Sequence, residues 1–239
     1  MIRSYFDLSR DYKSKYGEKT IVFMQCGGFY EIYGLRNEHG QIKTHLTPIE
    51  DFSKTVEYAI VDKKVCVNQQ RVVMAGFKTY FVEKMVKKMQ QVGFTVVVYT
   101  QKEQKEKSER YCSGIYSPGT LFDESQTSKM SNNISCIWIE ETRKNKTLHI
   151  GFSNIDVFTG NVNIYEFETD YNKNPCSYDL LEQIVNFYEP SEFILIHNID
   201  STHIKNVIQF VGLYKCQKSH ILDLNSPQND FLEDFSKNA

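Results

Sequence analysis

The chain has 239 residues, of which 41% are hydrophobic and 24% are charged, a balance that is normal for a soluble globular protein. A chain of this length can form one large domain or two of ordinary size. No apolar run approaches the length of a membrane span, and the first residues contain no apolar segment typical of a secretory signal. We therefore expect an intracellular protein.

The six cysteines are widely spaced, with no C-x-x-C pair and no Cys/His cluster at zinc-binding spacing. Free cysteine is most often a small buried hydrophobe. The pattern predicts a reducing environment and no metal site, and it does not identify the compartment.

The formal net charge of −2 conceals an asymmetry between the two halves of the chain. Residues 1–116 contain 19 of the 28 Lys and Arg residues and 13 of the 30 Asp and Glu residues. Residues 117–239 contain the other 9 basic and 17 acidic residues. A basic half joined to an acidic half indicates that only the first half meets a polyanion such as a nucleic acid.

The first half has the pattern of a mixed α/β domain. Helical periodicity is found at three ranges: residues 2–16, Phe52–Val61 and Tyr80–Gln91. Runs of β-branched and aromatic residues predict five strands: Ile21–Cys26, Phe29–Tyr33, Val72–Ala75, Phe94–Tyr99 and Arg110–Tyr116. The segment from Gly34 to Pro48 has the composition of a loop.

A run of Ser, Pro, Gly, Thr and Asn separates the two halves. It includes Pro118-Gly119 and has little apolar content, which is typical of a linker. The expected organisation is a domain over residues 1–116, a linker over 117–133, a second domain over 134–224 and the start of a further segment at 225–239.

The second half begins with strands at Ile134–Glu140 and Leu148–Phe152 and a hairpin at Val157–Tyr165. Helices and strands then alternate: a helix at Tyr178–Phe187, a strand at Phe193–Ile196, a helix at Thr202–Phe210 and a strand at Leu213–Cys216. The first of these helices is expected to have Ser177 as its N-cap and an apolar stripe of Leu180, Leu181, Ile184 and Val185. A three-stranded meander followed by β-α-β alternation resembles the RNase H-like sheet.

The most informative segment is Gly27–Tyr33, with the sequence GGFYEIY. Residues i and i+2 share a face of a strand, so Phe29 and Glu31 point the same way. The glycines, Gly27 and Gly28, let the backbone approach a partner closely. On an exposed face, the ring can stack on or wedge beside an unstacked base while the carboxylate accepts a hydrogen bond from a base edge. The alternative is an amphipathic hairpin with Phe29 in the core.

Six segments, in one order along the chain, resemble motifs of the MutS family of DNA mismatch-repair proteins. Gly27–Tyr33 is similar to the G-D-F-Y-E-L-F motif of the family's mismatch-binding domain. The other segments are Ser4-Tyr5-Phe6 (Q-Y-x), Met74–Met85 (M-A-G-I-P-x-H-A-x-x-x-Y-L), Gly93–Gln101 (G-x-x-V-A-I-C-E-Q), Ile115–Thr120 (V-T-P-G-T) and Gly151–Gly160 (the connector domain's G-x-x-x-x-D-x-S-x-G). The resemblance implies a mixed-sheet α/β mismatch-binding domain followed by an RNase H-like connector domain.

The resemblance also implies roles for individual residues. In the family, the phenylalanine of the motif enters the minor groove beside a mispair and the glutamate two residues later contacts the displaced base; these positions are Phe29 and Glu31. The implied partner is double-stranded DNA that contains mispairs, bound by a homodimer that forms through regions outside this chain. Basic residues of the first half are candidates for phosphate contacts: Lys78, Lys84, Lys87 and Lys88.

The chain departs from the family pattern at two positions. Gly28 replaces the aspartate before Phe29, and Lys78 stands where the proline of A-G-I-P is usual. Both departures put the preference for mispairs in question, and with the Asn- and Lys-rich composition they resemble the branch of giant viruses and octocoral mitochondria. No G-x-x-x-x-G-K-[ST] motif occurs, so we expect no enzyme activity and no cofactor in this segment, with ATP and Mg²⁺ bound by the family's ATPase domain further downstream.

Two other functions are compatible with the sequence. The first is a metal-dependent nuclease on the RNase H-like half, with Asp156 and Glu140 as candidate ligands, although no third acidic residue is evident. The second is an interaction module that keeps the fold without binding mismatched DNA.

Overall fold

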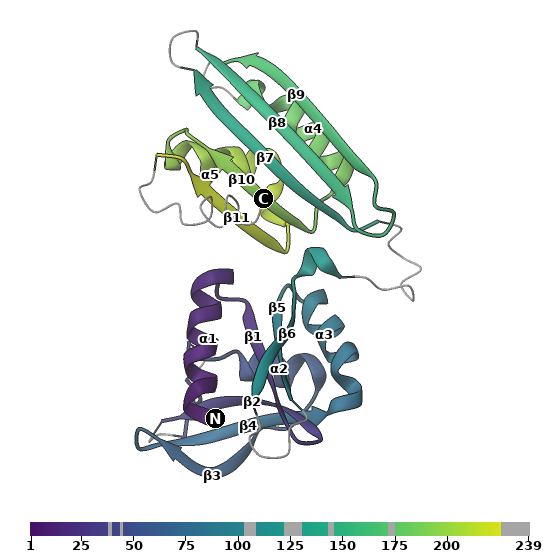
Figure 1. The fold of residues 1–239 in the computed structure, drawn as a ribbon. Helices are drawn as coiled ribbons and strands as arrows, with labels where there is room; N and C mark the ends of the chain where they lie inside the picture. The colour runs from purple at the N-terminus through teal and green to yellow at the C-terminus, as the bar shows by residue number, and fades with distance from the viewer. Residues whose placement is uncertain are drawn as a thin grey trace. The chain divides into compact units, whose positions relative to one another are not determined.

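The computed structural model describes residues 1–37, 40–43, 45–102, 109–121, 131–142, 146–171 and 175–225. The chain divides into two compact units, Met1–Leu121 and Phe122–Ala239, each with its own sheet and hydrophobic core (Figure 1). Among the described residues, no helix is both long enough and apolar enough to cross a membrane.

The first unit is built on a six-stranded mixed sheet with the order β3-β4-β2-β1-β5-β6. Its helices are α1 (Ile2–Tyr16), α2 (Ile49–Val56) and α3 (Val82–Gln91), and its strands are β1 (Thr20–Cys26), β2 (Phe29–Arg36), β3 (Val61–Val67), β4 (Gln70–Lys78), β5 (Thr95–Gln101) and β6 (Arg110–Tyr116). Strands β1 and β5 are parallel, and the other neighbours are antiparallel. This confirms the predicted mixed α/β class.

Helices cover both faces of this sheet (Figure 1). Successive residues of a strand point to opposite faces. On one face, Tyr33 of β2 packs against Tyr5 of α1, with ring centroids 4.9 Å apart. On the other face, Phe23 of β1 packs against Phe52 of α2, with ring centroids 5.6 Å apart. All four rings are buried, so the two helical layers anchor the sheet from both sides.

One predicted helix has different bounds, and one strand was missed. The helix expected at Phe52–Val61 begins at Ile49 and ends at Val56, because Glu57 adopts a left-handed conformation with φ 61°. Val61 instead begins β3, whose sequence VDKKVCV carries too many charged residues to predict a strand. Charge is tolerated there because β3 lies at the edge of the sheet and most of its residues are exposed.

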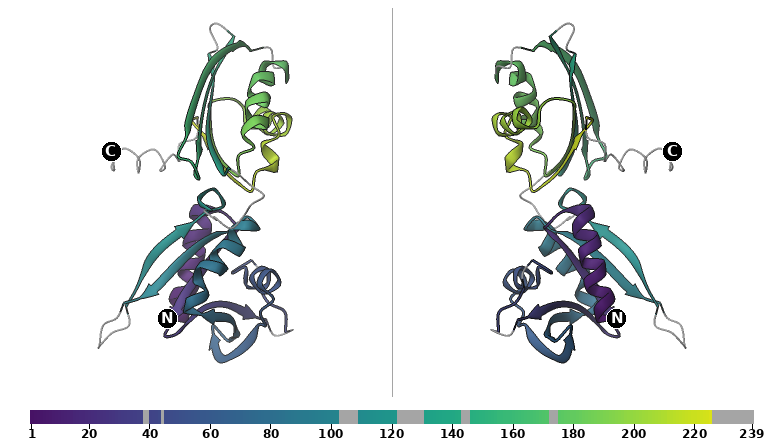
Figure 2. Two further views of the ribbon diagram at one scale, coloured as in Figure 1. Left: turned by 90° about the vertical axis from the view of Figure 1, so that its right-hand side faces the viewer. Right: turned by 90° about the vertical axis from the view of Figure 1, so that its left-hand side faces the viewer.

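The second unit is built on a five-stranded sheet with the order β11-β10-β7-β8-β9. Its strands are β7 (Asn133–Thr142), β8 (Thr147–Asp156), β9 (Val162–Asp170), β10 (Glu192–His197) and β11 (Lys218–Asp223), and its helices are α4 (Asp179–Tyr188) and α5 (Ser201–Phe210). Strands β7, β8 and β9 form an antiparallel meander, β10 is parallel to β7, and β11 is parallel to β10. Figure 2 shows α4 and α5 on the same side of this sheet.

Some local predictions for the second unit are wrong. Ser177 does not cap α4, since its hydroxyl donates to the carbonyl of Asp170 at 2.7 Å. Leu180 is 47% exposed rather than part of the apolar stripe, and Tyr188 is buried in its place. The strand expected at Leu213–Cys216 is a 3-10 turn at Leu213–Lys215, which follows Gly212 with φ 81°; the last strand, β11, begins later.

Candidate nucleic-acid interface

Phe29 lies at the end of a β-ladder in the first unit. It is the first residue of β2, opposite Cys26 of β1 on one side and Lys78 of β4 on the other. Because it stands at the end of the paired region, its side chain is only partly covered, and it is 48% exposed. The alternative in which Phe29 belongs to the core is therefore wrong.

The turn before Phe29 depends on one of its two glycines. Gly27 has φ 58°, whereas Gly28 has no positive φ. A positive φ at the first position alone is typical of a type II′ hairpin turn, which fits the right-handed twist of the flanking strands. A Cβ added at Gly28 would meet nothing within 4 Å, so the aspartate of the MutS-type motif would fit there.

Glutamine and arginine side chains fix the hairpin to the neighbouring strands. The backbone N–H of Gly27 donates to Oε1 of Gln101 at 3.1 Å, and the backbone N–H of Gln101 donates to Oε1 of Gln25 at 2.9 Å. Arg110 donates from Nε to the carbonyl of Gln25 at 2.7 Å. Sequence reasoning missed these three side chains, because hydrogen bonds between residues more than 70 positions apart give no local pattern.

Glu31 differs from the expectation. It shares the face of Phe29, but it is only 8% exposed, since α1 covers this face of the sheet through Tyr5 and Tyr33. Its Oε2 accepts a hydrogen bond from the hydroxyl of Tyr33 and forms an ion pair with Nζ of Lys63. The prediction that the Phe29 ring and the Glu31 carboxylate are both exposed is therefore wrong for the carboxylate.

Lys78 stands beside Phe29. It is the exposed last residue of β4, and its Nζ lies 5.8 Å from the ring centre of Tyr80, which is 69% exposed. The backbone N–H of Thr79 donates to the carbonyl of Gly28 at 3.0 Å, which ties this segment to the hairpin. Two rings and a cation therefore form one exposed surface: Phe29, Tyr80 and Lys78. Tyr80 was not among the site residues predicted from the sequence.

The other three candidate lysines lie on α3, the helix that follows this surface. Lys84 is exposed, whereas Lys87 and Lys88 are half-buried. A helix advances about 1.5 Å per residue, so Lys84 lies nearer to the start of α3 than the other two by roughly 5 Å. The structure thus places Lys78 directly beside Phe29 and the α3 lysines on the adjoining helix.

The two carboxylates proposed as nuclease ligands are not brought together. On the paired strands β7 and β8, Asp156 is opposite Asn133, whereas Glu140 is opposite His149. Seven residues along a strand separate the two levels by about 23 Å. The Asp156 carboxylate instead accepts hydrogen bonds from the hydroxyl of Thr159 and from nearby backbone N–H groups. Within the described residues, no group of three or more potential metal ligands occurs.

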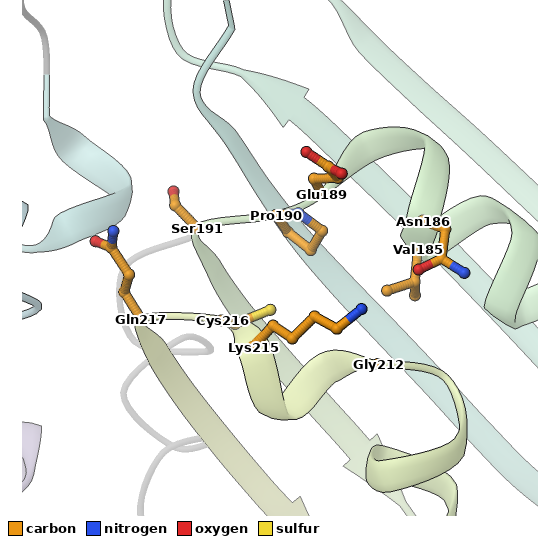
Figure 3. A pocket seen from close by; sticks show the side chains of 9 residues that line it. All are labelled: Val185, Asn186, Glu189, Pro190, Ser191, Gly212, Lys215, Cys216 and Gln217. Carbon is orange, nitrogen blue, oxygen red and sulfur yellow. The ribbon is translucent and has the colours of Figure 1, made fainter. Parts of the chain in front are cut away.

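A small pocket in the second unit lies between the end of α4 and the turn before β11 (Figure 3). Its volume is about 260 Å³, and Cys216 and Lys215 are among the residues that line it. Burial raises the pKa of the Cys216 thiol to about 11. Since the thiolate is the nucleophilic form of cysteine, this thiol is not activated for catalysis.

Comparison with known proteins identifies the family. Residues 1–125 match the family model for MutS domain I. A mutS homologue of Acanthamoeba polyphaga mimivirus is 32% identical over 225 residues, which cover 90% of this chain and 20% of that protein. The chain belongs to the MutS family. The DNA mismatch repair protein MutS of Caldicellulosiruptor bescii is 26% identical over 235 residues, which cover 91% of this chain and 23% of that protein.

The family resemblance inferred from the six motifs is thus confirmed. The relatives carry the name of DNA mismatch repair proteins, as does MutS of Halothermothrix orenii, which is 23% identical over 249 residues. This MutS-family chain spans between a fifth and a quarter of the length of these relatives.

Proposed function

We propose that this chain is the mismatch-recognition module of a MutS-type repair protein, in which Phe29 wedges beside a mispaired base and Glu31 accepts a hydrogen bond from it. The observation that carries the proposal is the half-exposed Phe29 ring at the end of a hairpin that Gln25, Gln101 and Arg110 hold in place. Inserting a ring between base pairs costs a few kcal/mol of unstacking, and less where pairing is already faulty. A rigidly held ring therefore favours the weakened site.

The charge of the first unit supports a DNA partner. Lys78 lies beside the wedge, and Lys84, Lys87 and Lys88 follow on α3. Cations around an inserted ring hold the two DNA backbones while the ring unstacks the bases, and they act on every sequence alike. Discrimination would then come from Phe29 and Glu31, and most of the affinity from the lysines.

The second unit, in this proposal, is the RNase H-like connector domain. The support is its strand order, with a meander on one side of β7 and two parallel strands on the other. The proposal places binding of ATP and Mg²⁺ outside these residues, since the chain lacks a phosphate-binding G-x-x-x-x-G-K-[ST] motif. It places dimer formation outside them as well, as the family resemblance implies. It assigns no catalytic residue to the chain.

Substitution of Phe29 by alanine tests the proposal. In the complete natural protein, Phe29→Ala should reduce the preference for mispaired over paired duplex by about 1–3 kcal/mol, the value of one stacked base. The matched control is Phe187→Ala, because Phe187 is also an exposed phenylalanine, 78% exposed on α4 of the second unit. The measurement is titration of both duplexes by fluorescence anisotropy at one salt concentration.

An interaction module without mismatch binding is the competing function, and the burial of Glu31 favours it. It predicts equal affinity for mispaired and paired duplex in the unsubstituted protein. An equal loss of affinity for both duplexes in Phe29→Ala would also refute the wedge, since a ring that reads the mispair must affect the two differently.

A further inference from the structure

The carboxylate of Glu31 is held through one of its two oxygens. The hydroxyl of Tyr33 and the ammonium of Lys63 both contact Oε2. The side chain of Glu31 is 11% exposed and that of Lys63 is 24% exposed, so this ion pair is largely shielded from water. Within the described part of the chain, every polar contact of this carboxylate is made by Oε2, which leaves Oε1 to accept a hydrogen bond from a partner.

An irregularity in β3 directs Lys63 towards this site. The register of β3 against β4 shifts between Asp62 and Cys66, and Lys64 has φ 55°. A bulge of this kind changes the direction of a side chain, and such bulges are common beside functional sites. Nζ of Lys63 lies 5.2 Å from the ring centre of Tyr33, whereas the neighbouring Lys64 is exposed.

A glycine, Gly76, lies on the strand between Glu31 and Lys63. Glu31 of β2 is paired with Gly76 of β4, and β4 lies between β2 and β3. A Cβ at Gly76 would lie 3.6 Å from Cγ of Glu31 and 3.0 Å from the carbonyl oxygen of Tyr30. The tight contact would be with the backbone of Tyr30, whereas the distance to Cγ of Glu31 is an ordinary van der Waals contact, so the glycine allows the close approach of β2 and β4 beside the carboxylate.

The same face holds further polar groups. Burial and then hydrogen bonds to Cys26 and Glu31 raise the pKa of Tyr33, so the phenol remains a donor at ordinary pH. Among the described residues, Tyr33 on β2 and Lys63 on β3 contact the carboxylate itself. Cys26 on β1 and Tyr5 on α1 contact Tyr33, and Arg110 on β6 and the chain's first residue, Met1, lie beside Cys26.

We propose that Lys63 is a positioning residue for base reading: it holds and neutralises Oε2 of Glu31, so that Oε1 can face a base without an uncompensated charge beside the DNA. The inference rests on the proposed function. A carboxylate next to two rows of phosphates is repelled by them unless a cation balances it. Lys63 supplies that cation from inside the protein.

The test compares Lys63→Met with Lys64→Met in the complete natural protein. Binding of mispaired duplex by Lys63→Met should be about tenfold weaker at neutral pH, as expected when a charged hydrogen-bond partner is removed. Without the cation, a carboxylate that is largely shielded from water favours its protonated form, and protonation removes the uncompensated charge, so the affinity of this variant should rise as the pH is lowered. The affinity for mispaired duplex should depend on pH in the same way in the unsubstituted protein and in Lys64→Met. Lys63→Arg should have the same pH dependence as these two proteins.

The double variant Glu31→Gln with Lys63→Met separates positioning from general folding effects. An amide carries no charge, so the extra pH dependence should disappear in it. If Phe29→Ala abolishes discrimination but Lys63→Met has the same pH profile as the unsubstituted protein, the positioning role is overturned and the wedge stands. If the unsubstituted protein binds both duplexes equally, the proposed function fails and this inference fails with it.

Discussion

The two sheets of this chain present their exposed hydrophobic residues in different surroundings. In the first unit, Phe29 and Tyr80 lie at one end of the sheet beside Lys78, in a half of the chain with an excess of basic residues. In the second unit, Trp138 and Ile164 are exposed on the meander, in the acidic half, and Nε1 of Trp138 donates to a carboxylate oxygen of Glu140 at 3.3 Å.

The difference shows that an exposed hydrophobic side chain indicates function only together with the charge around it. A ring beside cations suits DNA, whereas carboxylates around an exposed apolar side chain are repelled by the DNA phosphates. The two sheets also differ in how helices cover their faces. Helices pack on both faces of the first sheet, and its exposed rings lie at the end of a ladder (Phe29) and on the edge strand β6 (Tyr111 and Tyr116), whereas α4 and α5 lie on one side of the second sheet (Figure 2).

The largest expected effect is on the free energy of unfolding, and it tests whether the chain has two separate cores. Phe23→Ala removes a buried ring from the first core and Phe152→Ala removes one from the second. Each should reduce the free energy of unfolding of its own sheet by about 3–5 kcal/mol through the cavity it leaves. Hydrogen exchange with mass spectrometry should show lost protection in the strands around each substitution. Identical exchange patterns for the two variants would contradict the presence of two cores.

A smaller effect tests the charge difference. Lys84 on α3 and Lys205 on α5 are both exposed helical lysines, one in each unit. Lys84→Ala should weaken binding to every duplex and reduce the slope of log affinity against log salt by about 1, because one phosphate contact is lost. Lys205→Ala is the control and should leave the slope unchanged. Equal slopes for the two variants would show that Lys84 makes no phosphate contact.

The smallest expected effect compares the two hairpin turns. Gln25 and Gln101 hold the β1–β2 turn through amides, whereas Asp156 holds the turn between β8 and β9 through a carboxylate. Partial burial would raise the pKa of Asp156, but hydrogen bonds from the hydroxyl of Thr159 and from backbone N–H groups outweigh it, so the pKa lies below its usual range. A carboxylate with a lowered pKa stabilises the fold above its unfolded pKa of about 3.9.

This stabilisation should therefore be lost as the pH falls through the lower, folded pKa of Asp156. Thermal unfolding measured between about pH 2 and pH 6 should show the loss in the unsubstituted chain, and Asp156→Asn should lack that part of the pH dependence. Protection of the β1–β2 turn against hydrogen exchange should be the same in both proteins. A pH profile that Asp156→Asn does not alter would show that the carboxylate is not what holds the turn.

The local pattern of the chain predicts α1, β1 and β6 closely, because glycine or polar residues mark their ends. It ends β2 too early, at Tyr33 instead of Arg36, because the segment from Gly34 has the composition of a loop. It fails at β3, where an edge position tolerates charge, and at the turn Leu213–Lys215, where one buried leucine was mistaken for the start of a strand. The motifs alone also indicated the MutS family, which the comparisons confirm.

The sequence by itself determined the mixed α/β class, the hairpin that carries Phe29 and the family, since each can be recognised from short local patterns and from their order along the chain. Only the tertiary structure decided that Glu31 is buried against Lys63, that Tyr80 lies with Lys78 beside Phe29, and that Asp156 and Glu140 lie far apart. These outcomes depend on strand register and on which helix covers which face. Such pairings join residues that are distant in the chain, so no local pattern of side chains specifies them.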